Sequence, residues 1–157
     1  MSQFSIQITA YSEAAADIQA VRTAVFHQEQ GIDPALDFDG YDAACQHILV
    51  YANHQPIGTA RIRFLTPQLA KIERVAVLAD YRGQGIGSQI VQTAVSDLDQ
   101  KNIAESKVHA QIHATAFYLK LGFKPCGAAF YEAGLPHQEM RRSHPNRSPI
   151  TTPSRVE

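Results

Sequence analysis

The glycine-rich stretch Arg82-Gly83-Gln84-Gly85-Ile86-Gly87-Ser88 joins an apolar run, residues 75–78, to an amphipathic segment that begins at Gln89. A strand, a short glycine loop and a helix in this order predict a phosphate site. Alternating glycines let successive backbone N–H groups turn toward one anion, because no Cβ forbids a positive φ. The helix start adds unpaired N–H groups and the positive end of its dipole. Arg82 adds a guanidinium that suits phosphate oxygens, so we expect this loop to bind a pyrophosphate.

Two familiar phosphate motifs do not match this loop. A dinucleotide fingerprint G-x-G-x-x-G read from Gly83 requires glycine at the position of Ser88, and an acidic residue about 20 residues further on. A Walker A loop requires lysine after its last glycine, whereas Gly87 is followed by Ser88 and Gln89. Both are excluded. Taken alone, a glycine loop is also compatible with a tight strand-to-helix turn that binds nothing.

A second motif further along the chain narrows the interpretation. It runs Ala114-Thr115-Ala116-Phe117-Tyr118-Leu119-Lys120-Leu121-Gly122-Phe123. R-G-Q-G-I-G-S followed by A-x-x-F-Y-x-K-L-G-F resembles the GCN5-related N-acetyltransferase (GNAT) superfamily. Residues 73–78, 109–111 and 132–137 are similar to the small bacterial ElaA-like branch. The resemblance extends from Phe4 to Arg142.

This resemblance implies a single α/β domain with a GNAT-like three-layer fold, in which a mixed, mostly antiparallel central sheet is flanked by helices. We expect the domain to cover residues 1–142 and a flexible tail with three prolines to cover residues 143–157. Apolar periodicity predicts a first helix from Ser12 that stops at Gly31, and a second from Gln89 to Asn102. Strands are expected at 4–8, 47–52, 57–65, 70–78, 106–111, 127–132 and 138–142, and a short helix at 114–121.

The resemblance also implies acetyl-coenzyme A (acetyl-CoA) as the acyl donor. The glycine loop would hold its pyrophosphate, and main-chain groups of residues 75–77 would pair with the pantetheine arm. A backbone N–H near Val75 or Ala76 would donate to the carbonyl oxygen of the thioester. Gln111 stands where many relatives carry an asparagine that touches the cofactor. The residues expected at the cofactor are Val75, Ala76, Val77, Arg82, Gly83, Gln84, Gly85, Ile86, Gly87, Ser88, Gln111 and Tyr118.

Three residues are expected to take part in catalysis: Tyr118, Glu73 and His137. A phenol of pKa near 10 keeps its proton at neutral pH, so Tyr118 can donate to the departing thiolate; alternatively it is a core residue of an amphipathic helix. Glu73 lies two residues before Val75, on the same strand face, and could take a proton from the amine. It could equally form an ion pair with Arg61 or Arg63. His137 and Glu132 are competing bases.

Composition limits the partners. A net charge of −1 over 157 residues gives no footprint for nucleic acid or an anionic membrane, and no stretch approaches the ~20 apolar residues of a bilayer span. Cys45 and Cys126 lack metal-ligand spacing, so we expect two reduced thiols, no metal and a cytoplasmic protein. The loop at 33–42 carries four aspartates. They would attract a cationic amine, or simply form a solvated surface.

The sequence therefore predicts N-acetylation of a primary amine by direct attack in a ternary complex with acetyl-CoA. The acceptor would be a small molecule or a peptide amine. Two alternatives stay open: transfer of a different acyl group, and a non-catalytic CoA-binding sensor or interaction module. An exposed edge strand near the C-terminus also leaves a homodimer open.

Overall fold

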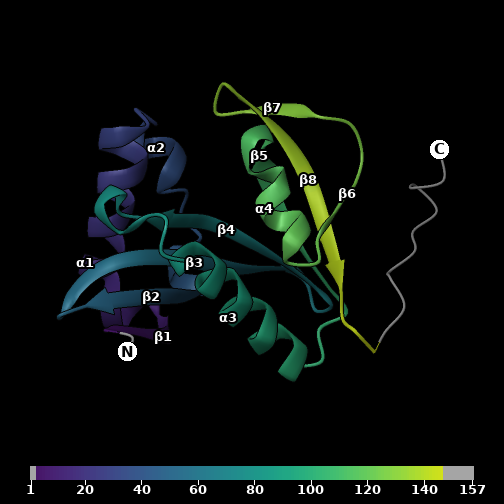
Figure 1. Ribbon diagram of the computed structural model, residues 1–157, viewed down its shortest axis with the longest axis horizontal. Helices are drawn as coiled ribbons and strands as arrows, with labels where there is room; N and C mark the ends of the chain where they lie inside the picture. Colours follow the sequence, from purple (N-terminus) through teal and green to yellow (C-terminus); the bar gives the residue numbers. More distant parts are fainter. Residues whose placement is uncertain (1–2, 147–157) are drawn as a thin grey trace.

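A computed structural model describes residues 3–146 and has helices packed on both faces of one sheet (Figure 1). The strands are β1 (Phe4–Ala10), β2 (Gln46–Ala52), β3 (Gln55–Thr66), β4 (Leu69–Val77), β5 (Glu105–Gln111), β6 (Lys124–Pro125), β7 (Phe130–Glu132) and β8 (Leu135–Ser143). The helices are α1 (Tyr11–Arg22), α2 (Pro34–Asp37), α3 (Ile86–Gln100) and α4 (Thr115–Lys120). A π-helix, η1 (Thr23–Glu29), and three 3-10 turns, η2 (Asp42–Ala44), η3 (Ala79–Tyr81) and η4 (Ile112–Ala114), complete the described elements.

The described strands form one sheet in the order β1-β2-β3-β4-β5-β8-β6, with β7 paired to β8. Neighbours are antiparallel except β4 and β5, which run parallel. The parallel pair requires a crossover, and α3 supplies it between the two strands. The predicted mixed, mostly antiparallel α/β sheet is confirmed.

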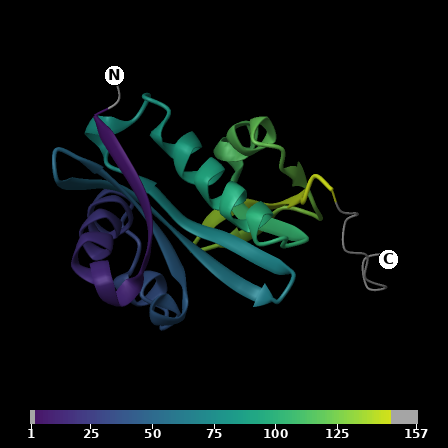
Figure 2. The same ribbon diagram turned by 90° about the horizontal axis from the view of Figure 1, so that it is seen from below.

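The three layers follow from alternation along the central strands. Side chains on one face of β2, β3 and β4 pack against the apolar face of α3, and α1 contacts the same strands from the other side. Figure 2 shows α1 and α3 on opposite sides of the sheet. The main core on the α3 side includes Ile48, Val50, Ile62, Ile72, Ile90, Val91, Ala94 and Leu98. A smaller cluster of Val21, Val25 and Ala76 joins α1 and η1 to β4.

The first helical segment differs from the prediction in its start and in its pitch. It begins at Tyr11 rather than after Ser12, and from Thr23 it continues as a π-helix to Glu29. Gly31 follows with φ +69, which is the left-handed stop expected there. Extra residues per turn in a π-helix shift the side chains around the axis, and apolar spacing alone does not reveal this shift.

The packed chain continues past the boundary expected at residue 142. β8 runs to Ser143, and the backbone N–H of His144 donates to the carbonyl of Ala104. Residues 147–157, most of the expected tail, lie outside the described part. Within residues 3–146, none of the helices has the length and hydropathy needed to cross a bilayer.

Candidate active site

The two parallel strands at the centre of the sheet pair over only one end of their length. Leu69–Lys71 of β4 face Glu105–Lys107 of β5, and beyond these residues the ladder between them stops. Further along, β4 pairs with β3 and β5 pairs with β8 on their outer edges, among the residues described. The inner edges at 72–77 and 108–111 thus face each other without a shared ladder. Such edges can pair with an extended ligand.

A β-bulge interrupts β4 beside this gap. Glu73 lies opposite Arg61, whereas Ala76 lies opposite Thr59, so β4 holds one extra residue here. Arg74 occupies the bulge with φ +58, a backbone conformation that is uncommon outside glycine. Its guanidinium is held 2.9 Å from Asp37 and 3.0 Å from Asp39. These ion pairs hold the side chain of the residue directly before Val75, which is expected to meet the cofactor arm.

The glycine loop is shaped as an open cradle at the start of α3. Gly83 and Gly85 have φ of +79 and +81, and Gly85 is the N-cap, with no side chain bonded to the first-turn N–H groups. A Cβ added at either position would meet nothing within 4 Å. Gly87 differs, since a Cβ there would lie 3.6 Å from the Phe117 ring of α4, an ordinary van der Waals distance. The first two glycines therefore face open space that a ligand can occupy, and the third lies where α3 packs against α4.

The Arg82 side chain is engaged elsewhere than over the loop. Its Nη atoms donate to the Glu29 carboxylate at 2.6 and 2.7 Å, and its Nε donates to the Val77 carbonyl at 2.9 Å. The Arg82 guanidinium, which was expected to bind phosphate oxygens, is thus bonded to the carboxylate of Glu29 in η1 in this structure. The pair is well exposed, with about two fifths of each side chain accessible. An anion could compete for it because exposed pairs are weak.

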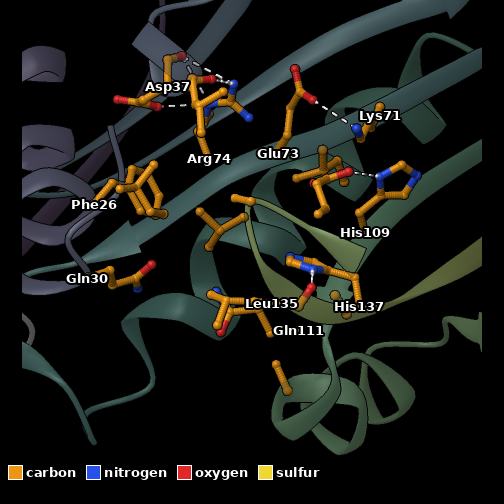
Figure 3. A pocket seen from close by; sticks show the side chains of 18 of the residues that line it. Phe26, Gln30, Asp37, Lys71, Glu73, Arg74, His109, Gln111, Leu135 and His137 are labelled. Carbon is orange, nitrogen blue, oxygen red and sulfur yellow. Dashed lines mark hydrogen bonds and ion pairs between the residues drawn. The ribbon is translucent and has the colours of Figure 1, made fainter. Parts of the chain in front are cut away.

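A cavity of about 500 Å³ brings together residues from both sides of the gap (Figure 3). Phe26 and Gln30 line one side, and Leu135 and His137 of β8 line another. The expected site residues that line it are Glu73, Val75, Gln111, Tyr118 and His137. Ala76 is buried in the small core cluster, and the glycine loop does not line this cavity. Tyr118 and Val75 thus line the same cavity.

Tyr118 lies in α4 and packs against two aromatic rings. Its ring lies edge-on to Phe117 and Phe123, with centroids 4.9 and 5.7 Å away. The side chain is almost fully buried, and burial raises the pKa of its phenol to about 12. Among the described residues, none forms a hydrogen bond with its hydroxyl. The phenol therefore stays protonated and keeps its donor available to a group in the cavity.

Glu73 is the centre of a buried ion network. Its Oε2 accepts hydrogen bonds from Arg61 and, at 3.0 Å, from Arg63, and its Oε1 lies 3.3 Å from the Lys71 ammonium. Burial alone would raise the pKa of this carboxyl, but the three cations together lower it. The ion pair considered as an alternative role for Glu73 is present. A carboxylate held by three cations is a weak proton acceptor.

The opposite wall carries His137 and Glu132. His137 is buried, and its Nδ1 lies 2.8 Å from the Leu135 carbonyl. Because a carbonyl can only accept, Nδ1 must carry the proton, and Nε2 is then the basic nitrogen of the neutral ring. Glu132 lies 3.0 Å from Nδ1 of His109. This hydrogen bond, together with nearby cations, lowers the pKa of the Glu132 carboxyl to about 2.

The acidic loop is not the free anionic surface that its composition suggested. Asp37 and Asp42 pair with the fully buried Arg22 at 3.0 and 2.6 Å, and Asp39 and Asp42 pair with Arg61 at 2.8 and 3.0 Å. Asp33 caps α2 by accepting from the N–H of Ala35. Three of the four aspartates thus neutralise arginines. These three carboxylates are therefore not available to attract a cationic amine, although the sequence had suggested this role.

Sequence reasoning missed several residues of the cavity. Phe26 and Gln30 come from the π-helical segment and its end, and Lys71 and Arg74 come from β4. His109 also lines the cavity and was not among the expected site residues. Its alternation with Gln111 along β5 was the available signal that both face the same side. Within residues 3–146, no three His, Cys, Asp or Glu side chains form a group suited to a metal ion.

Comparison with known proteins gives one consistent family. The family model for the acetyltransferase (GNAT) domain matches residues 11–144. The Bacillus subtilis protein YyaT is 39% identical over 125 residues, which is 78% of this chain and 84% of YyaT. The crystal structure of Escherichia coli ElaA matches with a TM-score of 0.80 at 29% identity, over 89% of this chain and 99% of ElaA. A GNAT family acetyltransferase from Elizabethkingia anophelis, with acetyl-CoA bound, shares the fold at 16% identity and a TM-score of 0.70, over 91% and 99% of the two chains.

Proposed function

The chain belongs to the GNAT family of acetyltransferases, and from this premise we propose that it transfers an acetyl group from acetyl-CoA to a primary amine by direct attack in a ternary complex. One observation carries the proposal. The gap between β4 and β5 opens into the same cavity as Val75 and Tyr118, and the glycine cradle lies at the end of the segment that leaves β4.

The donor half of the site would be built from main chain. Pyrophosphate would lie on the N–H groups at Gly83 and Gly85 and on the start of α3. The pantetheine arm would add to the open edge of β4 near Val75–Val77. The acetyl-CoA complex of the Elizabethkingia protein supports this cofactor, since that protein has the same fold. Cofactor affinity would then depend on backbone geometry more than on side-chain identity.

The reaction makes one bond and breaks one. A neutral amine nitrogen attacks the thioester carbon, the C–N bond forms, and negative charge gathers on the carbonyl oxygen, where a backbone N–H near Val75 would stabilise it. The C–S bond then breaks and sulfur leaves as a thiolate. A phenol whose pKa is about 12 gives up its proton reluctantly. Tyr118 would therefore stabilise the thiolate by a hydrogen bond. The proton that the attacking amine loses as the amide forms would end on sulfur.

We assign the general base to His137 rather than to Glu73. The Leu135 carbonyl holds Nδ1–H of His137, which leaves Nε2 as the ring nitrogen that can accept a proton, and the side chain lines the cavity. Glu73 already satisfies three cations, and its lowered pKa makes it a poor proton acceptor. Its role in this proposal is to hold Arg61 and Arg63 in place beneath the cavity.

Direct transfer is favoured over an acyl-enzyme. Neither cysteine lines the cavity. Cys45 is buried, and burial raises the pKa of its thiol, which lowers the thiolate fraction that a nucleophile needs. The amine would thus attack the thioester itself.

The test combines binding with product analysis. Thermal melting with and without acetyl-CoA should show stabilisation by the cofactor, and mass spectrometry of an amine panel should show acetylated product that depends on both protein and cofactor. Stabilisation with no product from any amine would favour a CoA-binding sensor. Transfer from succinyl-CoA or a longer acyl-CoA in preference to acetyl-CoA would favour a different acyl group. No stabilisation by any acyl-CoA would refute the donor site.

A further inference from the structure

We propose that the acceptor is an amine with a single cationic nitrogen and an apolar body, that Glu132 receives its ammonium group, and that Leu36 and Leu135 contact its body. This inference rests on the proposed function and names the substrate class for the same cavity. Two observations support it: most charged side chains of the cavity are already paired, and several apolar side chains of its lining are exposed.

Most carboxylates of the cavity are committed to cations of the protein. Asp37 pairs with Arg22 and Arg74, and it also bonds His27. Asp39 pairs with Arg61 and Arg74. Glu73 is held by Arg61, Arg63 and Lys71. A substrate cation would have to break these pairs to use the carboxylates, and breaking a buried pair is costly.

Glu132 is the exception among the carboxylates that line the cavity. Within the described part of the chain, it has no arginine or lysine partner within 4 Å; its partner is His109 at 3.0 Å. Its side chain is 45% exposed, compared with 2% for Asp37 and 6% for Glu73. It comes from β7, on the same hairpin as His137, the proposed base. An ammonium held by Glu132 would therefore lie on the same wall as the group that deprotonates it.

The cations of the cavity are committed in the same way. Arg63 pairs with Glu73 and stacks on Tyr41 at 4.5 Å, Lys71 pairs with Glu73, and Arg74 pairs with Asp37. An acceptor with its own carboxylate, such as a free amino acid, would therefore compete with an existing ion pair at each arginine or lysine among the described lining residues. A polyamine or an aminoglycoside would need several free carboxylates, whereas the cavity offers Glu132.

Apolar surface remains exposed on two parts of the cavity lining. Leu36 of α2 is 59% exposed and Leu135 of β8 is 38% exposed, although both line the cavity. Phe26 and Ile32 extend the wall on the Leu36 side, and Figure 3 shows Phe26 and Leu135 on different sides of the space. Covering such side chains with an apolar ligand is favourable by the hydrophobic effect. The body of the amine would fill the space between these walls.

The experiment compares n-alkylamines from propylamine to hexylamine with diaminoalkanes of the same lengths, using the full chain and acetyl-CoA. We expect kcat/KM to rise about two- to fourfold per methylene in the monoamines. Each diamine should be at least about tenfold poorer than the monoamine of equal length, because its second ammonium would enter the apolar space. Diamines equal to or better than monoamines, or no dependence on chain length, would overturn the inference.

Three variants assign the effect to residues. Leu36→Ser should flatten the dependence on chain length, and Leu65→Ser is its matched control, because Leu65 is exposed on β3 outside the cavity. Glu132→Gln should lower kcat/KM for every amine by a similar factor and leave acetyl-CoA affinity unchanged. A steep dependence that survives Leu36→Ser would contradict the proposed wall. Failure to acetylate any amine would refute the proposed function and the inference with it, whereas turnover with a flat profile would refute the inference alone.

Discussion

Replacing Tyr118 by phenylalanine removes one oxygen from the cavity and leaves the surrounding packing in place. The edge-on contacts with Phe117 and Phe123 depend on the ring, which is retained. The hydroxyl forms no hydrogen bond with the described residues, so its removal leaves no buried partner unsatisfied. We therefore expect the free energy of unfolding to change by less than about 1 kcal/mol, and acetyl-CoA affinity to stay within about twofold.

The expected effect on turnover comes from one hydrogen bond to a charged sulfur. Hydrogen bonds to charged groups are worth about 1.5–3 kcal/mol, which corresponds to a loss of about 10- to 150-fold in kcat. The raised pKa of Tyr118, about 12, makes complete proton transfer to a thiolate unfavourable. The loss should therefore fall short of the larger factors typical of general acids.

The assay measures CoA release under saturating acetyl-CoA, with calorimetric titration of acetyl-CoA on the same preparations. Tyr51→Phe is the matched control: its hydroxyl donates to Asp17 at 2.6 Å and Tyr51 does not line the cavity. That variant should lose some stability and keep its turnover. Unchanged kcat in Tyr118→Phe would remove the residue from the mechanism, and a large loss of stability would show that the phenol has a structural partner.

Four further predictions test other parts of the site. Gly85→Ala should cost about 1–2 kcal/mol of stability, because φ is +81 there, and should weaken acetyl-CoA binding at least tenfold in calorimetry; unchanged binding would exclude the cradle. Glu29→Gln should free Arg82 for the pyrophosphate and tighten CoA binding up to about fivefold, whereas weaker binding would mean that the pair positions the loop. Glu73→Gln should lower stability by about 3 kcal/mol in denaturant titration, since buried cations lose their carboxylate, and a neutral effect would contradict the network. The pKa of Glu132 is lowered from 4.5 to about 2, so its contribution to stability is complete above pH 4.5 and is lost as the pH falls through 2. The difference in unfolding free energy between wild type and Glu132→Gln should therefore shrink as the pH falls over that range. A difference that stays constant would contradict this prediction.

The shape of the glycine loop could be predicted from the sequence because its determinants are local, whereas its role at the cofactor stays a prediction. Residues 82–88 are contiguous in the sequence, and the absence of a Cβ permits the positive φ of Gly83 and Gly85. Tyr118 could be placed because the second motif is also contiguous. Its role stays a prediction, but its position in the same cavity as Val75 depended only on the order of the elements.

The acceptor side could not be predicted because its determinants are long-range. The aspartates at 37, 39 and 42 read as an exposed acidic loop until Arg22 and Arg61, from α1 and β3, are brought beneath them. The periodicity of the sequence predicts on which face of its helix or strand each arginine lies, but it does not predict which carboxylate that arginine will pair with. The bulge at Arg74 is held by contacts of the same long-range kind, since its guanidinium pairs with Asp37 and Asp39.

The central claim is that the acetyl group passes directly from CoA to an amine in this cavity. The most direct measurement uses acetyl-CoA labelled in its acetyl group, incubated with the wild-type chain and hexylamine, and follows the label by mass spectrometry of both protein and small molecules. We predict that the label appears in the amide, that one CoA thiol is released for each amide formed, and that the protein stays unlabelled. Label retained on the protein, or release of CoA without amide, would contradict the account.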